Sequence, residues 1–416
     1  MKTKKQILLN AEQIVNNKQL GKILTRAQIN FIVKEYIEEK INDSTMTKFL
    51  LAVCENGLNF SETYNLTKAM QNSGETLDLS ILDGVTADKH STGGVSDTTT
   101  LIIAPVLACN GIYFLKASGG ALGHTGGTAN KLQVFNGYNL TPSPAEALEL
   151  TKKNGACLIS QSETIAPADK KIYELRNKTN TIKNISLIAS SVMCKKLALG
   201  ADVILLDVKY GDGAFVKTKS EALKLGNLMR RIGIKDGKKI QIIYSQTIQP
   251  LGQNIGSKLE AMEALEVLRG KKGRLTNLAT KICVNIMYSA KGIAKATALA
   301  QVKKTIMSGC AIRKFKNMIS ASGGSTKLFF EKYPETSQNI YSDNHGIIEK
   351  IHTEELGNIC NKLESKNCDF GVRLYFKIGQ TIKMNDALFS IYNCKKLSIE
   401  DKNKFLNCIV FKKKSI

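Results

Sequence analysis

The sequence of 416 residues contains no tryptophan, six prolines and four histidines. None of its ten cysteines has a neighbour at C-x-x-C spacing, the pattern typical of zinc and redox sites. No apolar run reaches the roughly 18 residues that span a bilayer. Residues 6–13, which follow a basic start, are too polar for the apolar core of a signal peptide. We therefore expect a cytoplasmic location, reduced thiols, no zinc and no membrane association.

The formal net charge of +23 is the main compositional bias of the chain. A strongly basic protein can bind nucleic acid through clustered lysines and stacking aromatic side chains. Here the lysines are scattered, apart from a dense cluster at residues 412–414, and aromatic residues make up 6% of the chain. We therefore expect no nucleic-acid partner, but a mild attraction for anionic substrates.

The first 75 residues have the apolar spacing of amphipathic helices. Apolar residues recur at intervals of three and four within residues 29–37, 45–56 and 61–70. A stop signal, Asn-Ser-Gly, follows at residues 72–74. This pattern predicts a small helical domain over residues 1–75.

From about residue 80 the pattern changes to alternating strands and helices. Short apolar runs typical of buried strands occur at residues 112–115, 203–208 and 239–243. Helical patterns occur at residues 98–109, 220–232 and 257–268. This alternation predicts an α/β domain built on a sheet.

A serine- and glycine-rich stretch at residues 319–325 predicts a linker. After it, short β-like runs occur at residues 346–348, 372–376 and 387–392. We expect a small C-terminal α+β domain in this last part of the chain.

Two glycine-rich loops carry the strongest chemical signal. The first, residues 89–100, reads Lys-His-Ser-Thr-Gly-Gly-Val-Ser-Asp-Thr-Thr-Thr and leads into an apolar helix; the second covers residues 116–128. Glycine lets the backbone approach a ligand closely, and a helix N-terminus offers free N–H groups to an anion. Neither loop is a P-loop, because the Gly-Lys-Ser/Thr ending is missing. Since ligands bind beyond the carboxyl ends of strands in open α/β sheets, the two loops predict one phosphate cradle.

Arg176, Ser191 and Lys195 form a third candidate group. Ser191 and Lys195 are four residues apart, so they share one face of a helix. A wall with a serine, a lysine and an arginine suits recognition of a planar base rich in carbonyl groups. On this pattern alone, a solvated helix face remains the alternative.

The sequence resembles the thymidine/pyrimidine-nucleoside phosphorylase family along essentially its whole length, most weakly after about residue 320. The matching motifs are Lys-His-Ser-Thr-Gly-Gly-Val at 89–95, Leu-Gly-His-Thr-Gly-Gly-Thr at 122–128, Ala-Pro-Ala-Asp-Lys at 166–170 and Leu-Asp-Val-Lys-Tyr-Gly-Asp-Gly-Ala-Phe at 206–215. Such long motifs are highly specific.

The resemblance implies an α/β fold in three parts. These are a small helical domain of residues 1–75 joined by 167–197, a larger α/β domain with a mixed sheet in residues 76–166 and 198–325, and a C-terminal α+β domain of residues 326–416. It also implies an active site in the cleft between the helical and α/β domains, and a homodimer joined through the helical domain.

The resemblance assigns a role to each matching residue. The phosphate-binding positions are Lys89, Ser91, Thr100, Ser118 and Thr128. The catalytic positions are His90, Arg176 and Lys195, and the substrate-binding positions are Arg176, Ser191, Lys195, Lys116 and Leu122. No organic cofactor is implied. A potassium site would use the carbonyls of Ser96, Thr98, Leu251 and Asn254 with the carboxylate of Glu263.

The implied reaction is phosphorolysis of uridine, thymidine and deoxyuridine to the free base and a (deoxy)ribose 1-phosphate. Lys116 resembles the broad pyrimidine-nucleoside enzymes, whereas a thymidine phosphorylase restricted to deoxynucleosides is the alternative. A phosphoribosyltransferase of the anthranilate type would need paired carboxylates for magnesium, which the loops lack. A non-catalytic nucleoside-binding relative is a further alternative.

Several positions depart from the family pattern. Gly120 stands where the family has arginine, and Asn177 and Gln246 stand where it has aspartate. Ser96 stands where glycine is usual, beside the potassium position that the resemblance implies.

Overall fold

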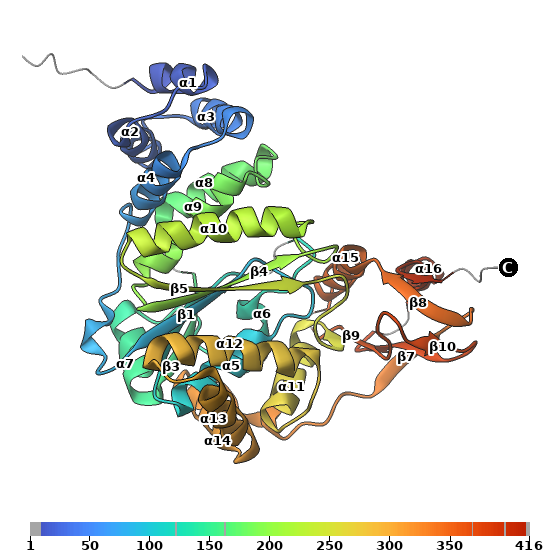
Figure 1. Ribbon diagram of the computed structural model, residues 1–416. Helices are drawn as coiled ribbons and strands as arrows, with labels where there is room; N and C mark the ends of the chain where they lie inside the picture. The colour runs from blue at the N-terminus through green and yellow to red at the C-terminus, as the bar shows by residue number, and fades with distance from the viewer. Residues whose placement is uncertain (1–9, 121–122, 162–163, 368, 395–396, 413–416) are drawn as a thin grey trace, which may run out of the picture. The chain divides into compact units, whose positions relative to one another are not determined.

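In a computed structural model of the chain, residues 10–120, 123–161, 164–367, 369–394 and 397–412 are described. The chain divides into two compact units (Figure 1). The first, the helical unit, comprises Met1–Leu79, Ser162–Ala201 and Leu223–Ile240. The second, the sheet unit, comprises Ser80–Gln161, Asp202–Ala222 and Gln241–Ile416. Among the described residues, no helix is both long enough and apolar enough to cross a membrane.

The helical unit begins with four helices, each of which starts at a side-chain cap. They are α1 (Ala11–Gln19), α2 (Arg26–Ile37), α3 (Asp43–Asn56) and α4 (Phe60–Gln71). Asn10, Thr25, Asn42 and Asn59 each accept a backbone N–H from the first turn that follows. Each cap satisfies a donor that has no partner within its helix. The helices predicted in this part of the chain are confirmed.

Two later helices complete the core of the helical unit. They are α8 (Pro167–Lys178) and α9 (Ile185–Ala198). Ile32, Phe49 and Leu66 of the first four helices are buried in one apolar cluster with Leu175 and Leu187. Segments far apart in the sequence therefore share a single core.

Helix α10 (Lys219–Lys235) begins in the sheet unit and ends in the helical unit. The sequence pattern assigns all of it to the α/β domain. Lys68 Nζ on α4 lies 2.8 Å from Asp236 Oδ1, just after α10. Gly233 lies so close to Met193 that an added Cβ would be 3.1 Å from the methionine Cε. These contacts join distant segments, so no local pattern could predict them.

A five-stranded sheet forms the centre of the sheet unit, in the order β3-β2-β1-β4-β5. Its strands are β1 (Thr86–Ser91), β2 (Tyr113–Ser118), β3 (Ala156–Ser160), β4 (Val203–Tyr210) and β5 (Lys239–Gln246). The pairings of β3 with β2, β2 with β1 and β1 with β4 are all parallel. Parallel strands are covered on both faces, and β4 is accordingly buried along nearly its whole length.

Helices flank this sheet, and Figure 1 shows α5 and α12 along one face. The helices of this part are α5 (Thr99–Cys109), α6 (Thr128–Gln133), α7 (Pro144–Asn154), α11 (Ser257–Leu268), α12 (Arg274–Lys291), α13 (Lys295–Met307) and α14 (Cys310–Ala321). The helices predicted at residues 98–109 and 257–268 are confirmed. The linker predicted at residues 319–325 is wrong at its start, because Ile319 still packs with Phe315 in the core as part of α14.

The C-terminal part of the sheet unit contains two antiparallel sheets, in the orders β6-β9-β11-β7 and β10-β8-β12. The strands are β6 (Asn254–Ile255), β7 (Thr336–Tyr341), β8 (Gly346–Ile351), β9 (Gly371–Leu374), β10 (Thr381–Ile382), β11 (Ala387–Tyr392) and β12 (Ile409–Phe411). The helices are α15 (Thr353–Glu364) and α16 (Ile399–Asn407). The predicted α+β character is confirmed.

Candidate active site

Lys89, His90 and Ser91 form the end of strand β1, where the sequence pattern predicts a loop. The strand reads Thr-Ala-Asp-Lys-His-Ser, so its polar side chains hide it from a hydrophobic pattern. Lys89 is 1% exposed, and its Nζ donates to Thr99 Oγ1 at 2.8 Å. Burial lowers the pKa of Lys89, although two nearby carboxylates act in the opposite direction. A buried ammonium at the carboxyl end of a central strand is suited to anchor an anion.

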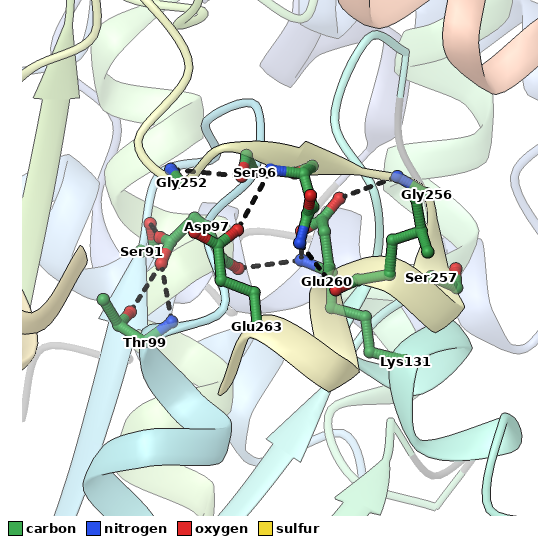
Figure 2. Close-up of polar contacts among 12 residues, drawn as sticks. Ser91, Ser96, Asp97, Thr99, Lys131, Gly252, Gly256, Ser257, Glu260 and Glu263 are labelled. Carbon is green, nitrogen blue, oxygen red and sulfur yellow. Dashed lines mark hydrogen bonds and ion pairs between the residues drawn. The ribbon is translucent and has the colours of Figure 1, made fainter. Parts of the chain in front are cut away.

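Asp97 holds the first loop together, and no separate signal in the sequence pointed to it. Its carboxylate accepts the Ser91 hydroxyl at 2.9 Å and the backbone N–H of Thr99 at 3.0 Å (Figure 2). Burial acts to raise the pKa of Asp97, but the ammonium groups of Lys209 and Lys89 outweigh it and hold this pKa well below its ordinary value. The loop is therefore organised around a carboxylate that stays ionised.

The second loop begins at Ser118, the last residue of β2, and ends at Thr128, the first residue of α6. The Ser118 hydroxyl is buried and has no hydrogen-bond partner in the described part of the chain. A buried hydroxyl without a partner is costly, so it marks a place where a ligand oxygen would be favourable. Thr128 is half-buried. Leu122, a predicted substrate contact, lies outside the described residues.

Lys131 on α6 links both loops to helix α11. Its Nζ lies 2.7 Å from Glu260 Oε2 and donates to the carbonyl of Asp97 at 2.8 Å (Figure 2). Both side chains of this ion pair are buried. Burial raises the pKa of Glu260, although Lys131 opposes this shift. The pair thus fixes three elements beside the candidate anion site.

The remaining candidates of the sheet unit lie on the same elements. Lys116 on β2 donates to the carbonyl of Lys89 at 2.7 Å. Thr100 is buried in the first turn of α5. Because side chains alternate along a strand, His90 lies on the opposite face of β1 from Lys89 and Ser91. The structure therefore places Lys89, Ser91 and Ser118 at the ends of two adjacent parallel strands, and Thr100 and Thr128 in the first turns of α5 and α6.

Arg176, a candidate for base recognition, lies on α8 in the helical unit and is 2% exposed. Its guanidinium donates to the carbonyls of Thr181, Ile182 and Leu187 at 2.8–3.4 Å. Since a guanidinium has five N–H donors, at most two remain for a ligand. Arg176 therefore also holds the segment between α8 and α9 in place.

Lys195 and Ser191 share one face of α9, as the four-residue spacing predicted. Lys195 Nζ forms an ion pair with Asp169 on α8 and lies 3.1 Å from Ser191 Oγ. Burial acts to lower the pKa of Lys195, but Asp169 outweighs it and raises this pKa. Asp169 falls within the Ala-Pro-Ala-Asp-Lys motif, which was the available signal for it. Lys195, Ser191 and Asp169 thus form one polar group within the helical unit.

The residues of the potassium site implied by the resemblance lie in the sheet unit. Glu263 on α11 accepts the backbone N–H groups of Gln253 and Asn254 at 2.9–3.0 Å. Ser96 has a φ of +61°. Its hydroxyl donates to the Asn254 carbonyl at 2.6 Å and accepts the N–H of Gly252 at 3.1 Å (Figure 2). Protein groups therefore already bridge the first loop and the segment before α11.

Two models of a glycosyl transferase family match this chain: the helical bundle domain over residues 12–74 and the a/b domain over residues 83–312. The pyrimidine-nucleoside phosphorylases of Geobacillus stearothermophilus and Bacillus subtilis (strain 168) are 36% and 37% identical to it, each over 91% of this chain and 91% of the relative. The chain belongs to the pyrimidine-nucleoside phosphorylase family. The family resemblance drawn from the motifs is confirmed.

A solved structure with the same fold lies outside the pyrimidine-nucleoside phosphorylases. The crystal structure of anthranilate phosphoribosyltransferase from Thermus thermophilus matches with a TM-score of 0.61 and 16% identity, covering 74% of this chain and 99% of that chain. At this identity the match shows the shared fold alone.

For this member of the pyrimidine-nucleoside phosphorylase family, the potassium donors suit a cation in kind, since they are carbonyl and carboxylate oxygens. Their present arrangement fits an ion poorly, because the Ser96 hydroxyl already donates a hydrogen bond to the Asn254 carbonyl oxygen. In addition, Lys377 Nζ donates to the Gly252 carbonyl at 2.6 Å, and Lys271 Nζ lies 3.8 Å from Glu263 Oε1. The described ranges contain no group of three His, Cys, Asp or Glu side chains able to hold a metal. Potassium binding therefore stays a prediction.

Replacing Ser96 by glycine should make the thermal stability more sensitive to potassium. The change removes the hydroxyl that occupies the Asn254 carbonyl, and glycine adopts a positive φ without strain. A ligand that binds the folded state raises the melting temperature by linkage. We would compare melting temperatures in potassium chloride and choline chloride for the natural chain, Ser96→Gly and, as a control that keeps the Cβ, Ser96→Ala. The same potassium effect in the natural chain and Ser96→Gly would contradict the prediction.

Proposed function

We propose that this chain catalyses the phosphorolysis of pyrimidine nucleosides by inorganic phosphate, giving the free base and a (deoxy)ribose 1-phosphate. The observation that supports this most is that Lys89 and Ser118 lie at the carboxyl ends of the adjacent strands β1 and β2. One is a buried ammonium, and the other is a buried hydroxyl with no partner in the described part of the chain. Charged and hydroxyl donors of this kind bind phosphate oxygens strongly.

The proposed reaction requires phosphate to attack the anomeric carbon while the base departs. Its transition state resembles an oxocarbenium ion, by analogy with glycoside hydrolysis. Lys89, Ser91 and Ser118 would hold the phosphate in line with the bond that breaks. Such positioning contributes several kcal/mol, because it replaces an encounter in solution by a fixed geometry.

The departing pyrimidine gathers negative charge, chiefly on its carbonyl oxygens. Lys195 would stabilise that charge from α9, where Asp169 keeps its ammonium protonated. Arg176 would contribute the N–H donors that are not already bonded to carbonyls of the α8–α9 segment. His90 would donate a hydrogen bond or a proton to the base. Each of these interactions strengthens as the bond breaks, which is what lowers the barrier.

Lys116 supports a broad substrate range that includes uridine, thymidine and deoxyuridine. Its ammonium is buried and donates to the backbone carbonyl of Lys89, one of the proposed phosphate-binding residues. The alternative is a thymidine phosphorylase restricted to deoxynucleosides.

We also infer a cytoplasmic homodimer joined through the helical unit. Leu20 and Ile23, 64% and 71% exposed, are apolar groups that such an interface would cover.

An absorbance assay on uridine, thymidine and deoxyuridine, with and without phosphate, tests the proposal. We expect release of the free base with all three nucleosides, and only when phosphate is present. Release from deoxynucleosides alone would establish the restricted alternative. No release from any nucleoside would overturn the proposal and favour a non-catalytic relative. Transfer from a phosphoribosyl diphosphate donor would instead indicate the phosphoribosyltransferase alternative.

A further inference from the structure

Strand β4 brings two further charged residues to the candidate phosphate site. In the parallel pairing of β1 with β4, Lys89 lies opposite Leu205 and Ser91 lies opposite Asp207. Side chains two residues apart lie on the same face of a strand, so Lys209 follows Asp207 on this face, beyond the end of β1. Both Asp207 and Lys209 are almost completely buried.

These residues form a buried cluster of four charges with the first loop. Lys209 Nζ lies 2.8 Å from Asp207 Oδ2 and 3.3 Å from Asp97 Oδ2. Lys89 Nζ lies farther from the same two oxygens, at 3.9 Å and 3.5 Å. The shortest of these contacts is the ion pair of Lys209 with Asp207. Lys209 is therefore the nearer counter-ion of both carboxylates.

The backbone of the first loop is shaped around Lys209. A Cβ added to Gly94 would lie 2.7 Å from Lys209 Cδ and 3.2 Å from its Cε. The lysine is 1% exposed, so its methylene groups have little room to move aside. The backbone N–H of Lys209 also donates to Thr92 Oγ1 at 2.8 Å. Gly94 and Thr92 of the first loop therefore pack directly against Lys209 of β4 and hold it in place.

The charge balance decides what this arrangement does for an anion. Asp97 and Asp207 place two negative charges within 4 Å of the Lys89 ammonium. Without another cation, these carboxylates would repel phosphate and draw Lys89 toward themselves, because charges interact strongly where water is excluded. Lys209 compensates one of them, so that the four groups sum to zero before phosphate binds.

We propose that Lys209 is a positioning residue for phosphate: it offsets one of the two negative charges of Asp207 and Asp97 and thereby keeps the Lys89 ammonium available to the anion. This inference rests on the proposed function for the identity of the anion. It assigns Lys209 no contact with the nucleoside. Removing its charge should therefore weaken phosphate binding selectively, and removing the Asp207 charge as well should restore it.

The test is a set of three variants: Lys209→Met, Asp207→Asn and the double variant. For Lys209→Met we expect the phosphate KM to rise on the order of 10- to 100-fold, the usual scale for disturbing a buried charge pair, with little change in the nucleoside KM. The double variant should recover most of that loss, because the cluster is again neutral. The stabilisation of each variant by inorganic phosphate in a thermal melt should follow the same order.

Lys18→Met in the helical unit is the matched control, since Lys18 forms an equally buried ion pair with Glu62 at 2.9 Å. It should lower the melting temperature without changing the phosphate KM. A phosphate KM within about threefold of the natural value in Lys209→Met would overturn the inference, as would a double variant no better than the single one. The thermal melt needs no turnover. If phosphate raised the melting temperature of the natural chain but no nucleoside were cleaved, the proposed reaction would be refuted and the role of Lys209 could still be tested. If phosphate did not raise the melting temperature of the natural chain, the proposed anion site would be refuted.

Discussion

Lys89→Ala should raise the phosphate KM by roughly 100-fold, corresponding to about 3 kcal/mol, the scale for truncating one partner of a buried, hydrogen-bonded charge pair. The variant loses a charged donor to phosphate and also leaves Asp97 and Asp207 with one cation fewer. Both effects act on the anion and neither acts on the pyrimidine. The nucleoside KM at saturating phosphate should therefore change little.

Steady-state kinetics with each substrate varied in turn would measure this effect. Lys217→Ala is a suitable control, because it removes a positive charge from the same unit at a half-exposed surface ion pair with Glu354. Surface pairs of this kind contribute about 1 kcal/mol or less, so the control should leave both KM values near those of the natural chain. If Lys89→Ala raised the two KM values equally, the assignment of the first loop to phosphate would fail.

Lys195→Ala should lower kcat and kcat/KM for uridine together, by about 2–4 kcal/mol in transition-state stabilisation, the scale of a lost oxyanion donor. The ammonium is needed most when the base carries negative charge, so its loss acts on the chemical step more than on substrate binding. The variant also leaves the Asp169 carboxylate buried without its partner. That second effect must be separated from the first.

The double variant Lys195→Ala/Asp169→Asn separates them, because it removes the stranded negative charge while the catalytic ammonium stays absent. We expect its melting temperature to recover and its kcat to stay low.

Arg176→Ala should lower kcat too, but it also frees three carbonyls between α8 and α9, so a loss of stability should accompany it. The two activity losses should add incompletely, since both groups act on one leaving base. Rates near the natural value in Lys195→Ala and Arg176→Ala would rule out the base-site assignment.

The sequence predicted most of the elements whose apolar residues follow a clear period. Helices α2, α3, α4, α5 and α11 and strands β2 and β4 were found in this way. Strand β1 was missed because Asp88, Lys89 and His90 interrupt any apolar alternation, although the sheet buries the first two. Their burial depends on partners from distant segments, which a local pattern does not contain.

The residues of the candidate site could be predicted from the sequence, but the hydrogen bonds and ion pairs among them could not. The long motifs identified Lys89, Ser91, Ser118, Arg176 and Lys195 through family resemblance. Neither spacing nor resemblance indicated that Asp97 would bond Ser91, or that Arg176 would hold three carbonyls of its own unit. These contacts follow from how loops and helices pack, so only the structure could show them.

The helical unit is assembled from three separate stretches of the chain, which the ribosome synthesises at different times. Helices α1 to α4 leave the ribosome before α8 and α9, which complete their core, by an interval on the order of ten seconds at typical elongation rates. Throughout that interval Ile32, Phe49 and Leu66 lack the Leu175 and Leu187 side chains that later bury them. A nascent chain at this stage exposes an apolar face that is not yet buried, and such a surface is prone to aggregation and is of the kind that chaperones protect.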